Sequence, residues 1–153
     1  MKLIAMRGIP GSGKSTIAAT IAEEYPAQII CRDDLRRALG SDKNGNGWSP
    51  SLEAEVKAVA KNMLIGHLLQ GRDVVVDETH TKVEKLRELA SLAEKFGYNF
   101  HVVNVVTPVE VCKERRVPEG FPGDVIDRLF EQFLASEADV HAEFKMNVIT
   151  LPW

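Results

Sequence analysis

The stretch Gly8-Ile9-Pro10-Gly11-Ser12-Gly13-Lys14-Ser15, with Thr16 directly after it, decides the fold of this chain. Apolar residues 3–6 precede the stretch, and residues 16–24 carry the apolar spacing of a helix. A strand, a glycine-rich loop and a helix in this order are the setting that a P-loop requires. The alternative, a chance glycine turn before a helix, would not explain why the whole motif and both flanking elements agree.

The spacing of the motif follows from the chemistry of phosphate binding. Glycines let successive backbone N–H groups turn inward around a polyphosphate, and the helix N-terminus adds the positive end of its dipole. Lys14 would reach the β- and γ-phosphates, and the Ser15 hydroxyl would bind Mg²⁺. We therefore expect ATP and Mg²⁺ as cofactors. The residues predicted to bind the nucleotide are Gly8, Pro10, Gly11, Ser12, Gly13, Lys14, Ser15 and Thr16.

The bulk composition indicates a soluble protein of one domain, residues 1–153, with 44% hydrophobic and 27% charged residues. A net charge of −3 argues against a protein that coats long nucleic acid. Cys31 and Cys112 form no close pair and are predicted to be reduced, buried thiols. Residues 3–6 are too short an apolar run for a signal peptide or a spanning helix, so we expect a cytoplasmic protein without a membrane partner.

Apolar runs alternate with helical patterns along the whole chain. Strands are predicted at 2–7, 27–31, 73–76, 100–106 and 147–151, and helices at 16–24, 32–39, 50–70, 81–96, 108–116 and from 124 onward. The expected fold is α/β, a P-loop kinase fold with a mostly parallel sheet of four or five strands, helices on both faces and a short lid. Such sheets bind ligands outside the carboxyl ends of their strands.

Three helix starts carry capping signals. Ser49 precedes Pro50, Thr81 and Glu84 have the spacing of a capping box, and Asp124 precedes an apolar helix.

Two carboxylates follow the second strand, in the run Arg32-Asp33-Asp34-Leu35-Arg36. Transfer of a phosphoryl group to a hydroxyl needs a base, and Asp33 and Asp34 both qualify. One of the two is also expected to cap the helix that begins there. Arg36 shares a helix face with Asp33 and would suit a phosphate of the acceptor, unless it forms only a surface ion pair.

Other charged residues stand at strand and helix ends. Asp77 ends the third strand and would hold Mg²⁺ through water or orient a neighbouring side chain. Thr79 and His80 would meet the acceptor or cap the next helix, and the other histidines are assigned no site. Arg115 and Arg116 precede a loop rich in Pro and Gly, from which an arginine can reach the transferring phosphate; the alternative is a solvated helix end.

A calcium loop is a further hypothesis. Asp42, Asn44, Asn46, Gly47 and Glu53 occupy positions one, three, five, six and twelve of the EF-hand pattern. The alternative is an ordinary connection rich in Asn and Gly.

Together these motifs resemble the 5′-kinase domain of phage-type polynucleotide kinases over nearly the whole chain. The resemblance implies that Asp33 is the general base and that Arg36 contacts the acceptor phosphate. It also implies that Asp77, Thr79 and His80 match an Asp-x-Thr-Asn stretch, with His in place of Asn. The lid arginine is Arg115 or Arg116, and the lid is shorter than in that family.

The resulting hypothesis is an ATP-dependent kinase that phosphorylates the 5′-OH end of DNA or RNA. The lack of an Asn-Lys-x-Asp signature argues against a GTPase. Two alternatives remain: a kinase for a small hydroxyl compound such as a nucleoside, sugar or antibiotic, and a nucleotide- or calcium-responsive module without transfer activity. The preference for DNA or RNA, the adenine-binding residues and the oligomeric state are not predicted.

Overall fold

The computed structural model describes residues 1–43 and 45–152, except for the side chain of Met146. The strands are β1 (Lys2–Arg7), β2 (Ala27–Cys31), β3 (Asp73–Asp77), β4 (Asn99–Val106) and β5 (Val148–Pro152). The helices are α1 (Lys14–Glu24), α2 (Arg32–Ala38), α3 (Pro50–Leu69), α4 (Val83–Phe96), α5 (Val109–Arg116) and α6 (Gly123–Phe144). Two short 3₁₀ turns, η1 (Val117–Glu119) and η2 (Lys145–Asn147), flank α6.

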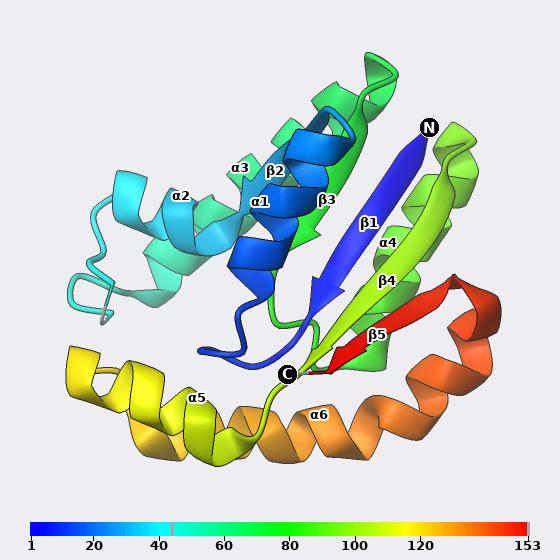
Figure 1. The fold of residues 1–153 in the computed structure, drawn as a ribbon. Coiled ribbons are helices and arrows are strands. Elements are labelled where there is room, and N and C mark those ends of the chain that lie inside the picture. Colours follow the sequence, from blue (N-terminus) through cyan, green and yellow to red (C-terminus); the bar gives the residue numbers. More distant parts are fainter. Residues whose placement is uncertain (44, 153) are drawn as a thin grey trace.

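The five strands form one parallel sheet in the order β2-β3-β1-β4-β5 (Figure 1). β1 is the central strand, and its residues 3–6 are apolar and buried, as expected for a parallel strand covered on both faces. Near the end of β1, Met6 is in register with Asp77 of β3, and Asp77 is in register with Cys31 of β2. The loops that follow β1, β2 and β3 therefore meet at one edge, which confirms the α/β fold and the predicted grouping of the motifs.

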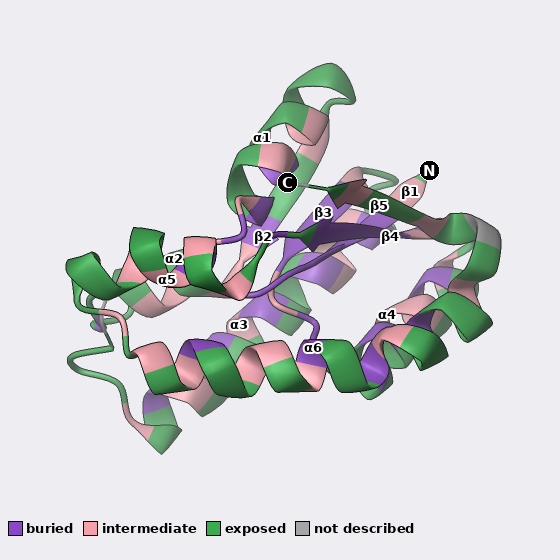
Figure 2. Ribbon diagram, turned by 60° about the horizontal axis from the view of Figure 1, so that its bottom comes forward, coloured by how far each residue is buried: buried purple, intermediate pink, exposed green. Residues whose placement is uncertain are grey.

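Helices cover both faces of the sheet. The larger core lies between the sheet and helices α3, α4 and α6, and α1 covers part of the opposite face (Figure 2). A third apolar cluster joins Ile9 of the phosphate loop to Cys112 of α5 and to Ile126 and Phe133 of α6. This cluster fixes α5 and α6 against the edge of the sheet that carries the predicted site.

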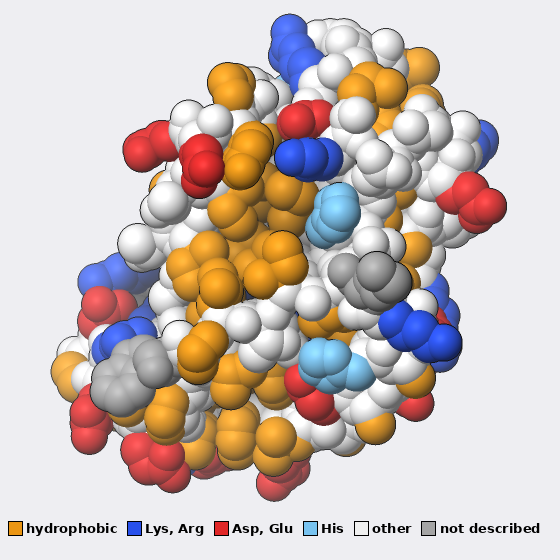
Figure 3. Space-filling view, turned by 45° about the vertical axis from the view of Figure 1, so that its right-hand side comes forward, with side chains coloured by type: hydrophobic (Ala, Val, Ile, Leu, Met, Phe, Trp, Pro, Cys, Tyr) orange, Lys and Arg blue, Asp and Glu red, His pale blue; other side chains and the backbone are white. Residues whose placement is uncertain are grey.

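β5 leaves apolar surface on the face that α1 covers only in part. Leu151 packs partly into the core beside α1, and Ile149, two residues earlier on the same side of the strand, is 53% exposed. Hydrophobic side chains gather on this side of the molecule (Figure 3). In the described part of the chain, no helix is both long and apolar enough to cross a bilayer.

Two of the three predicted helix caps are wrong. Ser49 does cap α3, because its Oγ accepts a hydrogen bond from the Leu52 amide at 3.0 Å. Thr81 forms no capping box, because its hydroxyl donates to the side chain of Gln132 and the N-cap of α4 is Lys82, one residue later. Asp124 lies inside the first turn of α6, which begins at Gly123. At Thr81, the hydrogen bond to Gln132 of α6 replaces the cap that the local sequence predicts.

Candidate functional site

The phosphate loop has the backbone that its glycines predict. Gly11 and Gly13 have positive φ angles of 86° and 92°, which only glycine adopts without strain. The amide of Ser12 donates to the Ile9 carbonyl at 3.1 Å, and the hydroxyl of Thr107 donates to the Ser12 carbonyl at 2.8 Å. These bonds hold the loop at the start of α1, where backbone N–H groups favour an anion.

The side chains of the loop leave polar groups available for a ligand. Lys14 is buried in the first turn of α1, and Ser15 beside it is exposed. The Ser12 hydroxyl and Asp77 Oδ1 are buried without a hydrogen-bond partner in the described part of the chain. Buried polar atoms of this kind are costly unless a ligand or water satisfies them. The residues present therefore fit a triphosphate with a divalent cation.

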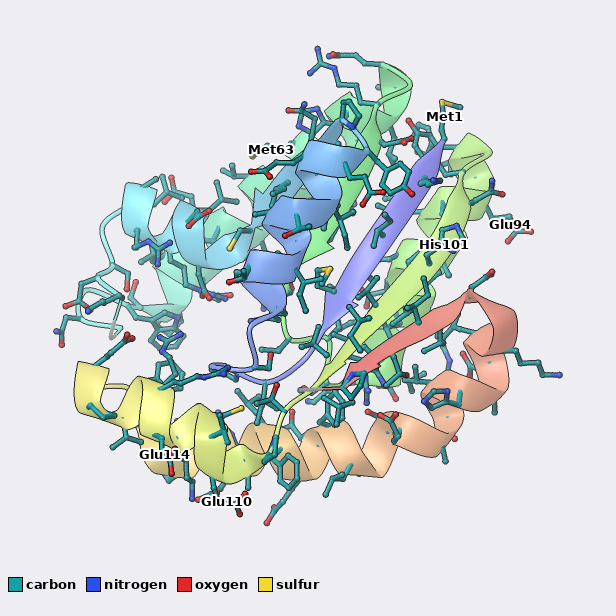
Figure 4. All side chains as sticks on the ribbon, in the orientation of Figure 1. Met1, Met63, Glu94, His101, Glu110 and Glu114 are labelled. Atoms are coloured by element: carbon teal, nitrogen blue, oxygen red, sulfur yellow. The ribbon has the colours of Figure 1, made fainter. Side chains whose placement is uncertain are left out.

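α5 brings one guanidinium to the loop. Arg115 Nη1 donates to the Gly11 carbonyl at 2.9 Å, whereas Arg116 pairs with Glu119 at 3.3 Å and lies over the ring of Phe121. Glu110 and Glu114 of the same helix point away from the loop (Figure 4). The helix packs closely, since a Cβ on Gly11 would lie 2.8 Å from the Cys112 carbonyl oxygen. Both predicted lid arginines therefore lie beside Gly11: Arg115 directs its guanidinium to the Gly11 carbonyl, and the Arg116 Cγ would lie 2.9 Å from a Cβ on Gly11.

The residues after β3 support the loop from the other side. Asp77 is 5% exposed, and the Thr79 carbonyl accepts a hydrogen bond from the Gly8 amide at 3.1 Å. His80 is buried, has a positive φ of 43°, and lies with Nδ1 2.5 Å from the Met6 carbonyl oxygen. Neither Thr79 nor His80 caps α4, which begins after Lys82. Burial lowers the pKa of His80, so the ring is neutral and Nδ1–H donates to that carbonyl.

Asp33 lies in the first turn of α2, directly after β2, and Arg36 lies in the last turn of the same helix. Arg36 Nη1 donates to Asp33 Oδ1 at 2.6 Å, and its Nε and Nη2 donate to the two carboxylate oxygens of Glu53, both at 2.8 Å. The Glu53 carboxylate, by hydrogen bonds and charge, raises the pKa of Arg36 further. The predicted helix cap by an aspartate is wrong, because Cys31 is the N-cap and Asp34 pairs with Arg37.

A cleft of about 470 Å³ opens between α3 and α4, and Arg32 at the start of α2 lines it. Its floor is apolar, with Leu64 and Val76, and Arg32 and His80 line it toward the edge that carries the phosphate loop. Arg32 forms ion pairs with Glu78 and, at 3.6 Å, with Glu53. Clefts of this size suit small ligands or part of a larger one.

The calcium hypothesis gains no support from the loop geometry. Glu53 binds arginines, and both Asp42 carboxylate oxygens accept hydrogen bonds from Asn46, at 2.9 and 2.6 Å. Asn44, at position three, lies outside the described residues. No group of three or more His, Cys, Asp or Glu side chains that could hold a metal ion occurs within 1–43 and 45–152.

Neither cysteine is paired. Cys112 is buried as predicted, and Cys31 is only half-buried. Burial, with Asp77 and the two α2 aspartates nearby, raises the pKa of the Cys31 thiol to about 11. Burial also raises the pKa of the Cys112 thiol, so both thiols are protonated at neutral pH and neither is an activated nucleophile.

Sequence reasoning missed Arg7, which looked like the last residue of a strand. Its side chain is fully buried, and its guanidinium donates to Asn104, Glu137, Ser136 and the Phe133 carbonyl, at 2.6–2.7 Å. Arg7 directly precedes Gly8, so this network attaches α6 to the strand end from which the phosphate loop begins. The sequence does place a charged residue between an apolar strand and the phosphate-loop motif, and this pattern could have indicated a buried, paired arginine.

Fold and site together define a P-loop kinase domain. A family model described as an AAA domain (AAA_33) matches residues 3–139, and the chain belongs to this family.

Several relatives share part of this sequence. An L-seryl-tRNA(Sec) kinase of Methanococcus maripaludis is 28% identical over 138 residues, and a 2′,3′-cyclic-nucleotide 3′-phosphodiesterase of Rattus norvegicus is 27% identical over 107 residues. These alignments cover 86% and 69% of the chain. The chain spans only 52% and 24% of these two proteins.

Solved structures share the fold. A chain in the structure of the Pnkp1/Rnl/Hen1 RNA repair complex superposes with a TM-score of 0.72 and 25% identity, over 90% of this chain and 45% of that chain. A gluconokinase from Sinorhizobium meliloti superposes with a TM-score of 0.64 and 21% identity, over 99% of this chain and 82% of that chain. The second likeness supports the fold alone.

Proposed function

We propose that this domain transfers the γ-phosphoryl group of ATP to the 5′-OH end of a polynucleotide. The donor side of the reaction uses the phosphate loop. Its backbone amides and Lys14 would bind the β- and γ-phosphates, the Ser15 hydroxyl would hold Mg²⁺, and Asp77 would hold the ion through water. Bound Mg²⁺ neutralises charge on the phosphate oxygens. Arg115 stabilises the charge of the transferring group from the side of α5.

The acceptor side uses the residues after β2. Asp33 accepts the proton of the attacking hydroxyl, and its carboxylate is 64% exposed. Arg36 orients that carboxylate and binds the phosphate on the 3′ side of the first nucleotide. A guanidinium has five N–H groups, and Arg36 uses three of them for Asp33 and Glu53, which leaves two for a phosphate.

One arrangement carries the proposal: an exposed carboxylate follows β2 at the same sheet edge as the phosphate loop after β1. β3 alone separates these strands, so their ends are about 10 Å apart. ATP bound with its γ-phosphate at the loop and an acceptor with its hydroxyl at Asp33 can meet between these two strand ends. The likeness to the RNA repair complex, at 25% identity over 90% of the chain, supports a polynucleotide acceptor.

The test is an acceptor panel with γ-labelled ATP and Mg²⁺. A 5′-OH oligonucleotide and a nucleoside 3′-monophosphate are expected to take the label, and a nucleoside without phosphate is expected to take little. Equal labelling of the plain nucleoside would overturn the role of the acceptor phosphate. ATP binding with no labelled product from any acceptor would indicate a module without transfer activity.

A kinase for a small hydroxyl compound is the second candidate. The cleft of about 470 Å³ between α3 and α4 favours it, because that volume suits a small ligand. This candidate predicts that a sugar or nucleoside reacts faster than any oligonucleotide, and the same panel distinguishes the two.

A further inference from the structure

Trp48 presents an exposed aromatic ring beside the proposed acceptor site. The residue is 51% exposed, in the connection between α2 and α3. Its indole Nε1 donates to Glu53 Oε2 at 3.3 Å. The same carboxylate binds Arg36 at 2.8 Å and pairs with Arg32, which lines the α3–α4 cleft. One carboxylate thus holds an exposed ring and two arginines in a single cluster.

The backbone around Trp48 is held on both sides. The Trp48 amide donates to the Gly45 carbonyl at 3.1 Å, and Gly47 lies so close to Gly40 that a Cβ on Gly47 would be 2.4 Å from the Gly40 carbonyl oxygen. On the other side, Ser49 caps α3. These contacts hold the backbone that carries the ring, and the hydrogen bond to Glu53 holds the edge of the indole.

The hydrogen bond of Trp48 engages the edge of the ring and does not use its faces. Proteins that hold single strands combine aromatic faces, on which bases stack, with arginines that pair with phosphates. The cluster of Trp48, Arg36 and Arg32 has both components, at the place where the acceptor phosphate is proposed to bind. We infer that Trp48 is the stacking platform for a nucleobase of the acceptor strand. This inference rests on the proposed function.

The first test compares Trp48→Leu with Trp48→Phe on oligonucleotides that carry an abasic residue at the first, second or third position from the 5′ end. Trp48→Leu is expected to raise the KM of an intact acceptor about 5- to 150-fold, the equivalent of losing one stacked base. Trp48→Phe, which keeps an aromatic face, is expected to retain most of the affinity.

The abasic acceptors separate stacking from a structural role of the loop. One abasic position is expected to raise the KM of the wild type and to cause no further rise in Trp48→Leu. If the Trp48→Leu penalty is the same on every abasic acceptor as on the intact one, Trp48 only shapes the loop and the inference is overturned.

A second readout does not depend on turnover. The chain has two tryptophans, so Trp153→Phe leaves Trp48 as the single emitter. A 5′-OH oligonucleotide without ATP is expected to quench its fluorescence, and ATP alone is not. Quenching by ATP only would assign the ring to the donor base and overturn the inference. If the wild type labels no oligonucleotide, the proposed function fails; if it labels them and Trp48→Leu has an unchanged KM, only the stacking inference fails.

Discussion

Replacing Arg7 by Met tests whether the buried network fastens α6 to the end of β1. The guanidinium is fully buried, and Met fills similar apolar volume without supplying any of its donors. The change removes four hydrogen bonds, those to Asn104, Glu137, Ser136 and the Phe133 carbonyl, at 2.6–2.7 Å. It also leaves Glu137 without its arginine partner.

The expected cost follows from the burial of the pair. Removing one partner of a buried ion pair costs about 3–5 kcal/mol, because the other charge and the former acceptors lose their compensation. Glu137 is 31% exposed, so water offsets part of the loss and the lower half of that range applies. For a chain of 153 residues, about 3–4 kcal/mol corresponds to a fall in Tm of roughly 10 °C.

Urea and thermal unfolding followed by circular dichroism measure this cost. The matched control is Arg87→Met, which removes the ion pair of Arg87 with Glu143, an exposed link between α4 and α6. Its Tm is expected to stay within error of the wild type, since exposed pairs contribute little. Equal effects of the two substitutions would refute the reasoning that burial makes the Arg7 network important.

Three further predictions follow from the site. Because burial lowers the pKa of His80 below its ordinary value of about 6.5, the unfolded chain binds the proton more readily. The free energy of unfolding should therefore fall below pH 6.5, by up to about 1.4 kcal/mol per pH unit, and urea midpoints of His80→Asn should lack this component. Gly11→Ala should weaken ATP binding and lower stability more than Gly45→Ala in calorimetry, since both have positive φ but only Gly11 has a neighbour within 3 Å of the added Cβ. Arg115→Ala should lower kcat about 10³-fold or more in the labelling assay, and an equal loss in Arg116→Ala would contradict the placement of Arg115 at the loop.

The fold was predictable because its signals are local and agree with one another. The phosphate loop and the apolar run of β1 each follow from a short stretch of sequence, and both are confirmed. The all-parallel order follows from strands that alternate with helices.

The parts that sequence could not give depend on contacts between distant segments. Arg7 meets α6 residues more than 120 positions away, and Thr81 bonds Gln132 instead of capping α4. Which guanidinium, that of Arg115 or that of Arg116, reaches the Gly11 carbonyl depends on how α5 packs against the loop. A pattern within one segment carries no information on such partners, so these assignments needed the packed structure.

The measurement closest to the central claim is single-turnover phosphoryl transfer to a 5′-OH oligonucleotide by Asp33→Asn and Asp34→Asn. The two residues are adjacent, similarly exposed, and each paired with an arginine three positions later. We expect Asp33→Asn to slow transfer about 10²- to 10⁴-fold, Asp34→Asn to stay near the wild-type rate, and both variants to keep the wild-type Kd for ATP. Equal rates in the two variants, or a near wild-type rate in Asp33→Asn, would contradict the role of Asp33 as the base.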